Sequence, residues 1–229
     1  MLRPKRRIAK RELKQDALIT TYAKLATFYG RERKRIGIVI TTVIVLFLAF
    51  IVYVKNQSAN EEKASSDLGR IFLYFDNGQY DIAVDGIPEK NLPGLRSIVE
   101  NYGNTPSGEL ARFYLASALY QKGNYDEARE QFEDFDGEGQ LLEAARYSGI
   151  AACYEAKGGY ADAAEFYEKA VGVASQDVSA AENLNNAARN YARDGNKEKA
   201  VELYKKIKKA YPATNYGREA DRHISRLSV

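Results

Sequence analysis

An uncharged run of nineteen residues, 36–54, limits what this chain can fold into more than any other feature of its sequence. Fourteen of the nineteen are Ile, Val, Leu or Phe. At about −0.3 to −0.6 kcal/mol for each of them, insertion of the run into a bilayer is favourable by about 4 to 8 kcal/mol. As a helix it covers close to the roughly 30 Å of bilayer hydrocarbon, and the hydroxyls of Thr41 and Thr42 can bond to the preceding turn. The sequence therefore predicts one transmembrane helix that contacts lipid from Ile36 to Val54.

The charge of the chain reverses across this run. Residues 1–35 carry twelve Lys or Arg against three Asp or Glu, a net +9. Residues 55–229 carry twenty-two against twenty-eight, a net −6, and the two parts sum to the +3 of the whole chain. Basic residues close to a membrane helix are retained on the cytoplasmic side. We therefore expect residues 1–35 to be a basic cytoplasmic tail, with the rest of the chain across the membrane.

Two features of the first 54 residues leave alternatives open. A cleaved signal peptide usually has an apolar region of about 7–15 residues behind a short basic start, so the 35-residue start favours a retained anchor. The tail places Leu18, Tyr22, Leu25 and Tyr29 on one face of a possible helix. Three interpretations of the tail stay open: an amphipathic helix that lies on anionic lipid, a docking helix for a membrane partner, or a disordered tail whose charge only fixes the orientation.

Residues 55–229 contain an internal repeat in which a glycine is followed by a tyrosine, an alanine and an aromatic residue at fixed spacing. The second copy lies 35 residues after the first, and the third lies 37 residues further, with Lys197 in the tyrosine position. Before each glycine, apolar residues follow the i, i+3, i+4, i+7 spacing of one helix face, with a small residue where a second helix must come close. The three copies are Gly123, Tyr125, Ala128 and Phe132; Gly158, Tyr160, Ala163 and Tyr167; and Gly195, Ala200 and Tyr204.

A helix, a turn and a helix at a period of about 34 residues resemble the tetratricopeptide repeat. We expect three such repeats and a capping helix over 109–229, and a juxtamembrane helix with an irregular first unit, broken at Pro88 and Pro93, over 55–108. Thr105, before Pro106, is expected to be an N-cap. The predicted fold is all-α: a single N-terminal transmembrane helix followed by a tetratricopeptide-repeat α-solenoid with a C-terminal capping helix.

The sequence carries little that indicates catalysis. The one histidine, His223, falls on the predicted capping helix, and the one cysteine, Cys153, falls beside a packing position of the second repeat. No phosphate-binding glycine loop and no metal-ligand spacing is present in the sequence. We therefore expect a protein-binding chain that is not an enzyme, without catalytic, metal or cofactor-binding residues, and with neither a nucleic acid nor a small molecule as its ligand.

In a solenoid of this kind the first helices of successive repeats line a concave groove. The repeat register places in this groove the residues of the first helices that are not used for packing. The alternative for each residue is that it is only solvated surface or that the capping helix covers it. Phe113 and Tyr120 would offer apolar contact, while Asn185, Arg189 and Arg193 could hold backbone or acidic groups of an extended segment. The candidate groove residues are Leu110, Phe113, Ser117, Tyr120 and Gln121; Ala145, Ser148, Ala152 and Glu155; and Glu182, Asn185, Arg189 and Arg193.

The order of a basic tail, one crossing, an irregular first unit and three repeats resembles the bacterial ancillary subunit family of the Sec translocon. The resemblance implies an inner-membrane protein with a periplasmic repeat domain that links the translocation channel to a membrane-anchored periplasmic chaperone of secreted proteins. An envelope scaffold for cell-wall or outer-membrane assembly complexes is the alternative with the same fold and orientation. An organellar import receptor with cytosolic repeats would reverse the orientation.

Overall fold

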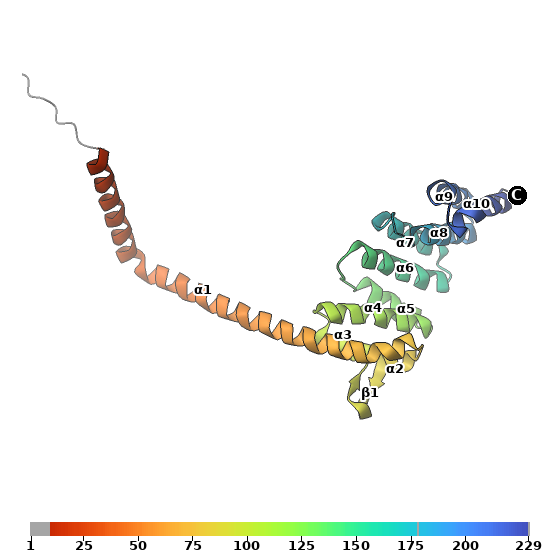
Figure 1. The fold of residues 1–229 in the computed structure, drawn as a ribbon, viewed down its shortest axis with the longest axis horizontal. Helices are drawn as coiled ribbons and strands as arrows, with labels where there is room; N and C mark the ends of the chain where they lie inside the picture. The colour runs from red at the N-terminus through yellow and green to blue at the C-terminus, as the bar shows by residue number, and fades with distance from the viewer. Residues whose placement is uncertain (1–9, 178, 229) are drawn as a thin grey trace, which may run out of the picture. The chain divides into compact units, whose positions relative to one another are not determined.

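The computed structural model describes residues 10–177 and 179–228, and the chain forms two units, Met1–Asn56 and Gln57–Val229. Residues 10–56 of the first unit lie in helix α1 (Lys10–Asp76), which passes without a break through the uncharged run (Figure 1). The sequence predicted an anchor helix and a juxtamembrane helix. They form one helix, because the chain has no proline between Pro4 and Pro88.

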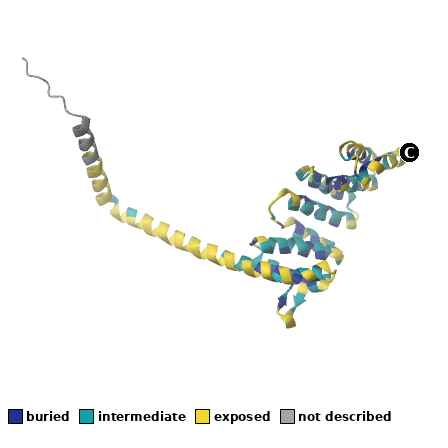
Figure 2. Cartoon of the chain, in the orientation of Figure 1, coloured by how far each residue is buried: buried dark blue, intermediate teal, exposed yellow. Residues whose placement is uncertain are grey.

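The uncharged part of α1 exposes its apolar side chains on every face of the helix (Figure 2). The hydroxyls of Thr41 and Thr42 donate to the carbonyls of Gly37 and Ile38, each at 2.9 Å, as the sequence predicts. Both hydroxyls are therefore bonded within the helix, as a bilayer requires. Helix α1 is long and apolar enough to cross a membrane.

The second unit begins with the C-terminal part of α1, which pairs with a short helix, α2 (Tyr80–Asp85). The interruption expected near Pro88 and Pro93 is a small antiparallel hairpin, which the sequence did not predict, before helix α3 (Leu95–Tyr102). Gly86 and Gly94 bring two backbones together: a Cβ atom on Gly94 would lie 2.2 Å from the Val84 carbonyl oxygen. The hairpin consists of β1 (Gly86–Ile87), the 3-10 helix η1 (Pro88–Lys90) and β2 (Leu92–Pro93).

Three helix pairs and a last helix follow in chain order, in green to blue in Figure 1. Their turns contain the repeated glycines, and Gly123, Gly158 and Gly195 have φ values of 84°, 81° and 91°. Only glycine adopts this left-handed conformation without strain, so the predicted role of the glycines in the turns is confirmed. The pairs are α4 (Pro106–Gln121) and α5 (Tyr125–Glu133), α6 (Gln140–Ala156) and α7 (Tyr160–Val173), and α8 (Ala180–Asp194) and α9 (Lys197–Ala210), followed by α10 (Asn215–Leu227).

The core of the repeat domain consists of two clusters that meet near Ala151 and Cys153. Leu119, Ile150 and Leu184, one on the apolar face of the first helix of each repeat, are at most 1% exposed. Many of the fully buried residues are alanines, and a small side chain lets two helix backbones come near each other. The fully buried alanines of the repeats include Ala111, Ala116, Ala118, Ala128, Ala151, Ala163, Ala164, Ala187, Ala188 and Ala200.

Two helix starts, those of α4 and α10, are built by the same motif. Thr105 Oγ1 accepts from the Gly108 amide at 3.1 Å and donates to the Tyr102 carbonyl at 2.8 Å. Thr214 makes the equivalent bonds to Gly217 and Tyr211 at 3.0 and 2.7 Å. The predicted N-cap at Thr105 is therefore confirmed, and both helices begin in register with the preceding chain.

Gly108→Ala is expected to destabilise the repeat domain by about 1–3 kcal/mol, because the new methyl group overpacks the site. It would lie 1.8 Å from the Tyr102 carbonyl oxygen. Gly69→Ala is the matched control: no atom lies within 4 Å of its Cβ position, so better helix propensity should stabilise by about 0.5–1 kcal/mol. Urea unfolding in detergent, followed by tyrosine fluorescence, measures the free energy of unfolding of both variants. Equal stability of the two variants would contradict the close approach at Tyr102.

Candidate functional site

Three of the predicted groove residues form one ion-pair cluster on the repeat domain. Glu155 projects from α6, and Arg189 and Arg193 project from successive turns of α8. Arg189 Nη2 lies 2.8 and 3.0 Å from the two carboxylate oxygens of Glu155, and Arg193 Nη1 lies 2.8 Å from Oε1. One carboxylate therefore holds two guanidinium groups that are one helical turn apart.

The side-chain amide of a buried asparagine holds the same carboxylate in place. Asn190, which is 0% exposed, donates from Nδ2 to Glu155 Oε2 at 2.9 Å and to the Asn186 carbonyl at 2.8 Å. Its Oδ1 is buried and has no partner among the described atoms. Tyr167 adds a longer contact, 3.4 Å from its hydroxyl to Oε2. The sequence did not indicate Asn190, because this residue falls between the groove positions Arg189 and Arg193 of α8.

These partners set the ionisation of Glu155. Burial raises its pKa, but the bond from Asn190 and the charges of Arg189 and Arg193 outweigh burial, and the net pKa is lowered from 4.5. Because the folded pKa is below the unfolded one, the cluster stabilises the fold above the unfolded pKa. That contribution is lost as pH falls through the lower folded value. The carboxylate is therefore ionised throughout the neutral range.

Arg189 and Arg193 also line a pocket of about 420 Å³ between α8 and the capping helix α10, together with Asn185. Arg226 lies on its wall and makes no ion pair within the described part of the chain. Glu219, the acidic residue of the lining, is paired with Arg222 at 2.7 Å. Because Glu155 already pairs with Arg189 and Arg193, Arg226 supplies the uncompensated positive charge of the pocket, beside aromatic surface, which suits a carboxylate next to an apolar group.

Aromatic rings form the apolar side of this pocket. The imidazole of His223 stacks on the ring of Tyr204 at 4.7 Å between centroids, and Tyr216 lines the pocket with them. Burial, and then the charge of Arg222, lower the pKa of His223, so its ring is neutral at pH 7. The sequence placed His223 on the capping helix without indicating this pocket. The spacing of Tyr216, Glu219, His223 and Arg226 along α10 is that of one helix face and is the signal that could have identified them.

The other predicted groove residues lie apart from this cluster. The ring of Phe113 packs on Phe132 and Phe135 at 5.5 Å each, and Tyr120 lies 5.3 Å from Tyr125. The Ser148 hydroxyl joins α6 to α8 through Asn183 at 3.0 Å, and the Ser117 hydroxyl donates to the Phe113 carbonyl. Gln121 and Glu182 are exposed, and Ala145 and Ala152 are half-buried.

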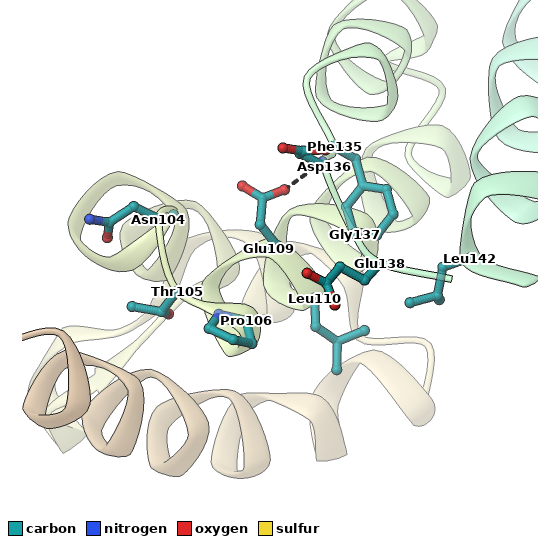
Figure 3. Close-up of a pocket in the computed structure, with 11 residues that line it drawn as sticks. Asn104, Thr105, Pro106, Glu109, Leu110, Phe135, Asp136, Gly137, Glu138 and Leu142 are labelled. Carbon is teal, nitrogen blue, oxygen red and sulfur yellow. Dashed lines mark hydrogen bonds between the residues drawn. The ribbon is translucent and has the colours of Figure 1, made fainter. Parts of the chain in front are cut away.

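Leu110 lines a separate pocket of about 520 Å³ (Figure 3). This pocket lies between the start of α4 and the loop that joins α5 to α6. That loop is where the first repeat departs from the pattern, with Gly137 and Gly139 in place of the closing proline. The sequence showed the departure but not the pocket, because the pocket depends on how the loop folds back.

The cysteine of the second repeat is placed as a packing group. Cys153 is 1% exposed, and burial raises the pKa of its thiol to about 12, so it is not a thiolate at neutral pH. Within residues 10–177 and 179–228, no group of three His, Cys, Asp or Glu is arranged to hold a metal ion. The chemistry that the described residues offer is that of binding through charge, hydrogen bonds and aromatic surface.

Comparison with known proteins agrees with the repeat fold. Residues 142–213 and 110–135 match family models of the tetratricopeptide repeat. No curated protein matches the chain. Among solved structures, two forms of the nearly identical TPR-like repeats of a candidate kinesin light chain from Podosopora anserina share the fold. One form, which carries a glutamine-to-methionine substitution, has a TM-score of 0.56 at 21% identity, over 73% of this chain and 85% of that one. The other has a TM-score of 0.55 at 22% identity, over 73% and 86%.

Repeats of this type are protein-interaction scaffolds, and here they follow a helix that is long and apolar enough to cross a membrane. The chain therefore contains tetratricopeptide repeats, stacked as an α-solenoid that ends in a capping helix, and carries a protein-protein interaction module.

Proposed function

We propose that the chain is a membrane-anchored periplasmic binding module that acts as an ancillary factor at the Sec translocon, linking the channel to periplasmic chaperones of secreted proteins. The proposal assigns residues 1–35 to the cytoplasm, 36–54 to the bilayer and 55–229 to the periplasm. The observation that supports its membrane-anchored part is that α1, which contains the uncharged run and is long and apolar enough to cross a membrane, extends into the repeat domain.

The orientation rests on charge. A net +9 before the run and −6 after it favour a cytoplasmic N-terminus, because Lys and Arg resist transfer across the membrane. The run Arg31, Arg33, Lys34 and Arg35 lies directly before the uncharged segment, where its effect on orientation is greatest.

The binding role rests on the pocket of the last repeat. Arg226, which has no ion pair among the described residues, offers its guanidinium group to a carboxylate. Arg189 and Arg193 add the N–H groups that Glu155 does not occupy, and Asn185 offers an amide to a peptide backbone. An extended polypeptide with an acidic side chain beside an apolar one matches this lining. Tethering at the membrane raises the effective concentration of such a weak binder near its partner, so modest contacts suffice.

Site-specific photo-crosslinking in intact bacterial membranes tests the proposal. A photoreactive residue at Asn185 samples the pocket, and one at Val45 samples the apolar surface of α1. Lys206, which is exposed on α9 outside the pocket, is the matched control. We expect channel components from Val45, and chaperones or exported polypeptides from Asn185 but not from Lys206.

The result also separates the alternatives. Recovery of only cell-wall or outer-membrane assembly proteins would overturn the translocon assignment and favour the envelope scaffold. Protection of the repeat domain from protease added to the periplasmic side would overturn the orientation.

A further inference from the structure

The pocket of Figure 3 is a preformed feature of an irregular loop. Phe135, which follows α5, is 5% exposed and packs its ring against Phe113. A Cβ atom at Gly137 would lie 1.9 Å from the Phe135 ring, so only glycine lets the loop fold over that ring. The loop is thus held in one position by the packing of its aromatic residue.

A carboxylate from the neighbouring helix fixes the other side of the loop. Glu109, in the first turn of α4, accepts from the backbone amide of Asp136 at 2.9 Å through Oε2. Its Oε1 accepts from Arg112 Nε at 3.2 Å, so the charge of Glu109 is already compensated. Figure 3 shows Glu109 reaching from the helix to the loop. The walls of the pocket are therefore ordered before any partner arrives.

The chemistry of the pocket is apolar with an acidic rim. Leu110 and Leu142 lie on its walls together with the edge of Phe135, while Asp136 and Glu138 are exposed in the loop. Neither of these two carboxylates makes an ion pair with any described residue, and no Lys or Arg lines the pocket. Two uncompensated negative charges therefore stand beside a space of about 520 Å³ that accepts aliphatic side chains.

We propose that this pocket binds a polypeptide segment that places a lysine or arginine next to a leucine-sized aliphatic side chain. The aliphatic group contacts Leu110 and Leu142, and the cation lies between Asp136 and Glu138. This partner chemistry is opposite to that of the arginine-lined pocket at the other end of the repeats. The inference is independent of the translocon assignment, and the two pockets let the module hold two different segments at once.

The test measures peptide binding by the full chain in nanodiscs of phosphatidylcholine, using fluorescence anisotropy. The probe is a fluorescein-labelled peptide of alternating leucine and lysine. The same peptide with glutamate in place of lysine, and a third with serine in place of leucine, are the comparison probes. We expect the leucine-lysine peptide to bind at least about tenfold more tightly than either, because each comparison probe lacks one of the two contacts.

Three variants locate the binding. Asp136→Asn with Glu138→Gln removes both rim charges from an exposed loop and should weaken binding about three- to tenfold. Glu130→Gln with Asp134→Asn makes the same charge change outside the pocket and should leave binding unchanged. Leu142→Ala should weaken binding by about tenfold. Equal binding of the glutamate peptide, or equal loss in the rim and control variants, would overturn the proposal.

Discussion

Replacing Arg189 and Arg193 together by glutamate is expected to abolish partner capture by the arginine-lined pocket. The carboxylate of Glu155 now lies within 3.0 Å of both guanidinium groups, so the variant brings three negative side chains to one place. An acidic segment that enters the pocket then meets these carboxylates. Like-charge contacts of this kind cost several kcal/mol, which corresponds to roughly a 100-fold or greater loss of affinity for the segment. Crosslinking from Asn185 and anisotropy with a glutamate-containing peptide both measure the loss.

Three controls make this prediction specific. Lys205→Glu with Lys206→Glu reverses two exposed charges on α9 outside the pocket and should leave capture unchanged. Arg189→Lys with Arg193→Lys keeps the charge but loses the two-pronged geometry, so capture should fall by an intermediate amount. Glu155→Gln removes the internal carboxylate and should strengthen capture several-fold, because the guanidinium groups are released. Unchanged capture by the folded double glutamate variant would remove this pocket from the binding mechanism.

Val45→Arg with Leu46→Arg is expected to release the chain from the membrane. These residues lie at the centre of the uncharged run, where each arginine costs about 2.5–3.5 kcal/mol on insertion. The two together cost about 5–7 kcal/mol, against the roughly 4 to 8 kcal/mol that favours the native segment on the same scale. Insertion then has little or no driving force. Extraction of membranes with alkaline carbonate should leave the native chain in the pellet and release the variant.

Val45→Leu with Leu46→Ile is the control, because it keeps the run apolar and should remain in the pellet. The repeat domain of the arginine variant should keep its urea midpoint, since Val45 and Leu46 lie outside the unit that contains the core. Retention of the arginine variant in carbonate-washed membranes would show that contacts other than those of 36–54 hold the chain there.

Local rules account for most of the fold. The position of Gly123, Gly158 and Gly195 follows from the need for a left-handed turn between two helices, and the structure confirms it. The helix faces follow from a spacing of three and four residues, because such residues are neighbours on any helix. The cap at Thr105 is equally local, since its partners lie three residues away on either side.

The candidate sites depend on partners that are distant in sequence. Glu155 and Arg189 are 34 residues apart, and the periodicity placed both in the groove without showing that they would pair. The hairpin at Gly86 and the loop at Phe135 were visible only as breaks in the repeat pattern. Their shapes depend on a close approach of backbones at Gly94 and on a ring-ring contact with Phe113. Neither contact leaves a periodic signal.

The sequence by itself determined the uncharged helix, the charge difference across it, the three repeats and the capping helix. Each of these depends on composition or on neighbours within one or two helical turns. Only the tertiary structure decided that Glu155 occupies the guanidinium groups of Arg189 and Arg193, that His223 stacks on Tyr204, and that Asp136 and Glu138 stand without an ion-pair partner among the described residues beside Leu110. The physical reason is that side chains from different helices meet according to the crossing angles and loop paths of the whole solenoid, which no single segment encodes.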